Sequence, residues 1–103
     1  MRVFSIRPFR EAAIRYPNDR DAIMDVFKVL DKGHYETPEK LKAAFPSLDN
    51  FRYKDKWYVI DIGGNSLRLL AMIIFENETV LVRHIVTHAE YDKLCAKGRK
   101  GAL

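Results

Sequence analysis

Cysteine is nearly absent from this chain of 103 residues, since Cys95 is the only one. An intrachain disulfide is therefore impossible, and a cysteine-based metal site cannot form. Long apolar runs are missing as well, because the longest, Leu69–Phe75, is far shorter than the roughly 20 residues that cross a membrane. The apolar start Met1–Ile6 is too short for a signal peptide, and Arg7 follows at once. These absences predict a cytoplasmic protein with no membrane partner.

Metal-binding patterns are lacking too. His34, His84 and His88 do not have the spacing of metal ligands. Three clustered acids are interpreted as the solvated side of an amphipathic helix: Asp19, Asp21 and Asp25. We therefore expect neither a metal nor a cofactor.

What the chain does have is an excess of basic residues, with 18 Lys and Arg against 14 Asp and Glu and a formal net charge of +4. Its end is basic, because no acidic residue follows Asp92. A polyanion such as nucleic acid, or an acidic protein, would fit this charge. A solvated surface with a basic tail fits it equally well, so charge alone leaves both interpretations open.

Two apolar stripes with helical spacing occupy the N-terminal third of the chain, within residues 9–16 and 23–30. Pro17 separates them, and Gly33 is a natural stop for the second. The pattern predicts a helical hairpin after a short strand at residues 3–6, and then a short helix that begins at Pro38. The side chains expected to pack on a sheet are Phe9, Ala12, Ile23, Val26, Phe27 and Leu30.

From Phe51 onward the apolar pattern has a period of two, which is typical of β-strands. Strands are predicted at 56–62, 66–75 and 79–86. Gly63-Gly64 should form a hairpin turn, because glycine adopts positive φ without steric cost. Thr87 and Glu90 have the spacing of a capping box, which predicts a last short helix. The order predicts one α+β domain over residues 1–103, with a basic tail at 97–103 that we expect to be flexible.

Arg68 and Arg83 are each the only charged residue inside a strongly apolar strand. Each should share a face with its apolar neighbours two residues away, because side chains alternate along a strand. If these strands pair, the two guanidinium groups can lie near each other and grip a phosphate. The alternative is that both arginines are structural and are paired with a carboxylate such as Asp61.

The segment Thr87–Asp92 follows directly. If Thr87 caps the last helix, His88 is its first residue and Tyr91 lies one turn later on the same side. A helix N-terminus attracts anions, and histidine can exchange a proton near neutral pH. An imidazole and a phenol are therefore predicted beside Arg83. The alternative keeps Tyr91 in the core and His88 as an exposed first-turn residue.

Several spaced motifs resemble the HigB toxin family. They are Phe45-Pro46-Ser47-Leu48-Asp49-Asn50, Ile62-Gly63-Gly64-Asn65, Leu67-Arg68, Val82-Arg83 and Thr87-His88-Ala89-Glu90-Tyr91-Asp92-Lys93. The last run is the most specific of them. The resemblance implies a RelE-like fold, in which an antiparallel sheet of about four to five strands carries the N-terminal helical hairpin on one face and ends in a short helix.

The same resemblance implies a function and partners. It implies a metal-independent endoribonuclease, an mRNA interferase, that cleaves messenger RNA during translation on the ribosome. It also implies a HigA-like helix-turn-helix antitoxin that represses the shared operon, so that operator DNA is reached only through the antitoxin.

The resemblance carries a catalytic set over from related toxins: Arg68, Arg83, His88 and Tyr91. Beside this set we expect secondary contacts to the RNA from Lys54, Lys56, Asn65 and Lys93. Two positions depart from the expected pattern: His84 replaces an apolar or acidic residue, and Val86 replaces a glycine. Regular alternation puts His84 on the opposite face from Arg83, so His84 is interpreted as structural.

The expected reaction uses the 2′-hydroxyl of the RNA itself as the nucleophile. The two arginines would stabilise charge on the phosphoryl oxygens. His88 would transfer a proton, and Tyr91 would orient the RNA, stack on a base or assist that transfer. Two alternatives remain on the same fold: a non-catalytic module that binds RNA or protein, and an inactive relative that keeps only antitoxin binding.

Overall fold

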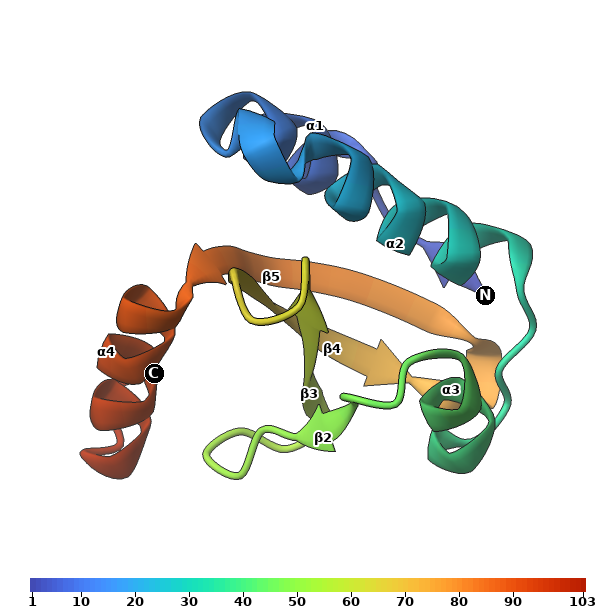
Figure 1. The fold of residues 1–103 in the computed structure, drawn as a ribbon. Coiled ribbons are helices and arrows are strands. Elements are labelled where there is room, and N and C mark those ends of the chain that lie inside the picture. Colours follow the sequence, from blue (N-terminus) through green and yellow to red (C-terminus); the bar gives the residue numbers. More distant parts are fainter.

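A five-stranded sheet with the order β1-β5-β4-β3-β2 lies at the centre of the computed structural model, which describes residues 1–103 (Figure 1). The strands are β1 (Arg2–Val3), β2 (Asp49–Asn50), β3 (Trp57–Ile62), β4 (Leu67–Ile74) and β5 (Thr79–Thr87). The α+β class and the strand number are confirmed. The sheet is mixed rather than purely antiparallel, because β1 pairs with β5 in parallel.

The helices α1 (Arg7–Arg15) and α2 (Arg20–Lys32) form the predicted hairpin and lie together over the sheet (Figure 1). A 3₁₀ turn, η1 (Pro17–Asp19), joins them, and a second, η2 (Phe75–Asn77), connects β4 to β5. The first helix ends before Pro17, because proline disfavours a helical residue in front of it. The short helix α3 (Pro38–Ala44) is capped by the Thr37 side chain, which accepts a hydrogen bond from the Lys40 backbone N–H.

The main core lies between these helices and one face of the sheet. Phe9, Ala12, Ile23 and Leu30 are buried there, and Val26 and Phe27 pack against them half-buried, so the predicted helical contacts are confirmed. The sheet contributes Ile60, Ile62, Leu67, Leu69, Ala71, Ile73 and Val80. Each large side chain buried here stabilises the fold by about 1.5–3 kcal/mol.

The last helix, α4 (His88–Arg99), packs on the opposite face of the sheet. A second cluster of Phe51, Trp57, Val59 and Leu70 is buried there, and Tyr91, Leu94 and Cys95 of α4 cover it. The residues of β3 and β4 in the two clusters alternate along each strand, as the pleat requires. The predicted helix is confirmed, and it continues to Arg99. None of the helices is long and apolar enough to cross a membrane.

A β-bulge in β5 changes the direction of two side chains. Leu70 pairs with His84 and Ala71 pairs with Val82, which leaves Arg83 as an extra residue between them. Arg83 and His84 consequently both approach the Trp57 ring of the α4 face, at 5.7 Å from the arginine Cζ and 6.3 Å between ring centroids. The prediction that His84 points away from Arg83 is therefore wrong. The sequence of β5 alone did not indicate this bulge, because its place depends on the pairing with β4.

Candidate functional site

Arg68 connects the sheet to the first residue of α4. Its side chain is only 13% exposed, and its Nε lies 3.1 Å from Oδ1 of Asp61, the residue directly opposite in β3. Its Nη2 lies 3.1 Å from Nδ1 of His88. Arg68 is therefore paired with a carboxylate, as the structural interpretation predicted. It also contacts His88, the residue predicted to transfer a proton.

His88 lies between an arginine and an acid. A guanidinium group can only donate hydrogen bonds, so His88 Nδ1 accepts the bond from Arg68 and Nε2 carries the proton of the neutral ring. Nε2 faces Asp92 one turn later, with 3.7 Å to Oδ2. The His88 side chain is 62% exposed, so RNA can approach the ring.

Tyr91 is half-buried, which agrees in part with the alternative that Tyr91 packs in the core. Its ring lies edge-on to Phe51, with 6.2 Å between centroids. Burial, followed by the neighbouring Cys95 thiol, raises the pKa of Tyr91 well above its ordinary value, and the positive charge of Arg68 opposes this only in part. Tyr91 therefore stays a phenol at neutral pH and can donate a hydrogen bond or stack, but it is a poor proton acceptor.

Arg83 has no acidic partner, since it takes part in none of the seven ion pairs of the molecule. Its exposed guanidinium lies over Trp57. Beside it, burial and then the positive charges of Arg83 and Lys97 lower the pKa of His84, which keeps that ring neutral at neutral pH. An unpaired guanidinium at the surface is available to an anion.

The two arginines share the α4 face but are not opposite each other in the sheet. Arg68 pairs with Val86, three positions along β5 from Arg83. Because Arg83 is the extra residue of the bulge at the Leu70–Ala71 step, it lies two to three positions from Arg68 along the sheet, or roughly 7–10 Å at about 3.3 Å per residue. Their long side chains could reach one phosphate from two sides or two successive phosphates.

The four residues predicted to bind RNA are all exposed: Lys54, Lys56, Asn65 and Lys93. Lys54 lies on the α4 face, because its Nζ is 5.9 Å from the Trp57 ring centroid and donates to the Leu103 carbonyl at 3.0 Å. Asn65 adjoins Arg68, whose Nη1 donates to its carbonyl at 3.4 Å. Lys54 and Lys56 border a pocket of about 420 Å³ formed by residues 50–58. No group of three His, Cys, Asp or Glu residues is arranged to hold a metal ion.

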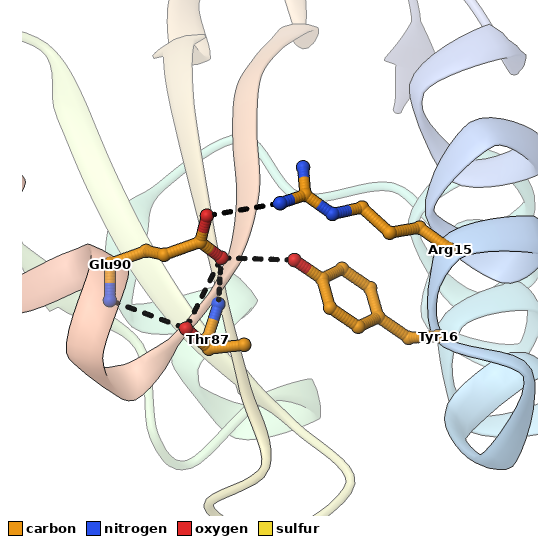
Figure 2. Close-up of polar contacts among 4 residues, drawn as sticks. All are labelled: Arg15, Tyr16, Thr87 and Glu90. Atoms are coloured by element: carbon orange, nitrogen blue, oxygen red, sulfur yellow. Dashed lines mark hydrogen bonds and ion pairs between the residues drawn. The ribbon is translucent and has the colours of Figure 1, made fainter.

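Glu90 is a part of this region that sequence analysis recognised only as half of a capping box. The box is present, because Thr87 and Glu90 exchange the expected hydrogen bonds. In addition, Glu90 Oε1 accepts from the Tyr16 hydroxyl at 3.0 Å, and Oε2 lies 3.2 Å from Nη2 of Arg15 (Figure 2). The polar hydroxyl of Tyr16 in an otherwise apolar stripe could have shown that it needs a partner, but not which one.

Comparisons with known proteins identify a family model and several relatives that this chain resembles. A family model described as HigB_toxin, RelE-like toxic component of a toxin–antitoxin system, matches residues 19–94. The mRNA interferase HigB of Escherichia coli O6:H1 is 50% identical over 94 residues, which cover 91% of both chains. The mRNA interferase toxin HigB of E. coli K12 is 41% identical over 104 residues, which cover 97% of this chain and 100% of the relative. The mRNA interferase HigB of Shigella flexneri is also 41% identical over 104 residues.

Proposed function

Because this chain belongs to the HigB family of RelE-like toxins, we propose that it is the toxin of a toxin–antitoxin pair and acts as an endoribonuclease that cleaves messenger RNA. The observation that carries the proposal is the 50% identity to an mRNA interferase HigB over 91% of both chains. We further propose that cleavage occurs on translated mRNA at the ribosome, and that a HigA-like helix-turn-helix antitoxin neutralises the toxin.

The proposed reaction is an attack of the RNA 2′-hydroxyl on the adjacent phosphorus. The new O–P bond forms as the bond to the 5′-oxygen breaks, which gives a 2′,3′-cyclic phosphate and a 5′-hydroxyl. A group must take the proton of the 2′-hydroxyl, another must supply one to the leaving oxygen, and cations must stabilise the phosphoryl oxygens. We assign the proton acceptor to His88, the cations to Arg68 and Arg83, and the proton donor for the leaving 5′-oxygen to the phenol of Tyr91.

Binding of RNA changes the hydrogen-bond partners of both Arg68 and His88 in this scheme. In the free protein Arg68 donates a hydrogen bond to Nδ1 of His88, the only ring nitrogen that can accept a proton. A phosphate oxygen competes for the same guanidinium, since arginine binds phosphate with two parallel hydrogen bonds. Binding of RNA thereby releases Nδ1 to accept the 2′-hydroxyl proton. Asp61 retains its ion pair with Arg68 Nε and keeps the guanidinium in place.

The remaining residues bind and orient the RNA. Arg83 contributes an unpaired charge for the same or the next phosphate. Tyr91 donates a hydrogen bond or stacks on a base, consistent with its raised pKa. Contacts further along the RNA backbone are assigned to Lys54, Lys56, Asn65 and Lys93, all of which are exposed.

Expression of the chain with and without its neighbouring gene tests the proposal. The chain alone should arrest growth and produce new 5′-hydroxyl RNA ends within coding sequences, and a co-expressed antitoxin should abolish both effects. His88→Ala is the matched control, and it should cleave about 10²–10⁴-fold more slowly if His88 transfers a proton. Where the chain also cleaves isolated RNA without the ribosome, a chelator should not change the rate of that reaction. A folded, soluble chain that neither arrests growth nor creates RNA ends would favour the non-catalytic alternative.

A further inference from the structure

The helix that carries His88 and Tyr91 is weakly held by the core. None of its residues is fully buried, and Tyr91, Leu94 and Cys95 are only partly covered where they meet the second cluster. Its first turn, however, has a polar attachment to the end of α1, 74 positions away in sequence, which Figure 2 shows. The position of His88 beside Arg68 therefore depends on more than the packing of α4.

We propose that Tyr16 and Glu90 form a positioning latch that holds the first turn of α4 so that His88 Nδ1 meets Arg68. This inference deepens the proposed function and rests on it, because it names positioning residues for the same cleavage reaction. No hydrogen bond or ion pair joins Tyr16 or Glu90 to the side chains of Arg68 and His88. Both residues act through the placement of the helix.

Three hydrogen bonds converge on Glu90 Oε1. They come from the Tyr16 hydroxyl at 3.0 Å and from the backbone N–H and the hydroxyl of Thr87, each at 3.1 Å. In return, the backbone N–H of Glu90 donates to the Thr87 hydroxyl at 3.2 Å. Hydrogen bonds to a charged acceptor are about twice as strong as neutral ones. The carboxylate thus fixes the turn that begins with His88.

Tyr16 is the stronger half of the connection to α1. Arg15 also reaches Glu90, but its side chain is 65% exposed, and exposed ion pairs contribute little to stability. Tyr16 is half-buried and packs against the main core that contains Phe9 and Ile23. Through its hydroxyl, the fixed position of α1 sets the position of α4.

The decisive variant is Tyr16→Phe, which removes the hydroxyl and keeps the ring in the core. A misplacement of about 1 Å can slow catalysis roughly 100-fold, so we expect kcat to fall about 10- to 100-fold. KM should change by less than about twofold, because no RNA-binding residue is altered. Tyr58→Phe is the matched control, because Tyr58 is also half-buried and packs edge-on to Phe75, while its hydroxyl has no hydrogen-bond partner in the protein. It should retain the wild-type kcat.

A second measurement does not depend on cleavage. The ¹⁵N NMR signals of the His88 ring in the free protein should show one tautomer, with Nδ1 as the acceptor. In Tyr16→Phe, measured below its melting temperature, they should move toward a mixture of tautomers. If the wild-type chain cleaves no RNA but the ring signals change in this way, the proposed function is wrong, whereas the positioning of His88 by Tyr16 and Glu90 is supported.

The chemistry of the latch is tested at Glu90. Glu90→Gln keeps an acceptor oxygen for Tyr16 and should retain more of the kcat and more of the His88 tautomer than Glu90→Ala. Two results would overturn the proposal. One is wild-type kcat and wild-type ring signals in folded Tyr16→Phe. The other is the same behaviour in Glu90→Ala.

Discussion

Arg68 and Arg83 have nearly the same local sequence context, yet the fold gives them different surroundings. Each follows an apolar residue in a strand. Arg68 is 13% exposed and paired with Asp61, whereas Arg83 is exposed and lies over Trp57 without an acidic partner. A substitution at Arg83 should therefore affect only the interaction with RNA, while one at Arg68 should also affect the stability of the sheet.

The first prediction separates these effects. Arg68→Ala and Arg83→Ala should each lower the cleavage rate roughly 100-fold, as expected for the loss of one preorganised charge-stabilising group. Only Arg68→Ala should also lower the free energy of unfolding, by about 1–3 kcal/mol, because it leaves Asp61 without its partner. Urea unfolding beside single-turnover kinetics measures both. Arg10→Ala, on the exposed side of α1, is the control for loss of a positive charge. Equal and large stability losses in both variants would mean that both arginines are structural.

At the scale of elements, the attachment of α4 should depend on pH. The backbone N–H of Thr87 and then the Tyr16 hydroxyl lower the pKa of Glu90 below the ordinary glutamate value of 4.5. The folded state therefore prefers the ionised carboxylate. This contribution to stability is fully present above about pH 4.5 and is lost as the pH falls through the pKa in the folded state.

This linkage gives the second prediction. Glutamine does not titrate, so the difference in unfolding free energy between the wild-type chain and Glu90→Gln should be largest near neutral pH and should shrink toward pH 3. Denaturant unfolding at a series of pH values measures it. A difference that stays constant on acidification would show that the charge of Glu90 does not stabilise α4.

The turn between β3 and β4 provides the third prediction. Gly63 and Gly64 have φ values of +62° and +71°, where a side chain costs about 1–2 kcal/mol. A Cβ at Gly63 would lie 2.7 Å from Oδ1 of Asp19, whereas a Cβ at Gly64 would meet nothing within 4 Å. Gly63→Ala should therefore destabilise the chain more than Gly64→Ala. Thermal unfolding of the two variants measures the difference, and equal melting temperatures would mean that Asp19 moves aside freely.

The limits of sequence-based prediction are visible in these same elements. The Gly63-Gly64 turn and the Thr87 cap depend on local chemistry, and both were predicted correctly. The bulge at Arg83 was not, because it depends on the register against Leu70 and Ala71 in the neighbouring strand. The Tyr16–Glu90 contact was not predicted either, since two residues 74 positions apart share no local pattern. The catalytic set stays a prediction that kinetics must test.

At the scale of the whole molecule, the α4 face and the face covered by α1 and α2 divide the surface into different roles. The α4 face carries Arg83 over Trp57 and the exposed Lys54 beside the chain end. The opposite face of the sheet is covered by helices over the main core. A net charge of +4 attracts any polyanion without regard to place, so a specific RNA path must be found from where the phosphate contacts lie.

The salt dependence of RNA binding answers this question and gives the fourth prediction. Each phosphate contact with single-stranded RNA adds about −0.7 to the slope of log K against log salt concentration. In a His88→Ala background, which slows cleavage, Lys56→Ala and Arg83→Ala should each make the slope shallower by about that amount. Lys28→Ala, an exposed lysine of α2, should leave the slope unchanged because it lies away from the proposed RNA path. Binding titrations at four or more salt concentrations measure the slopes. If Lys28→Ala reduces the slope as much as Arg83→Ala does, then the RNA is bound by diffuse charge, and the α4 face has no special role in placing it.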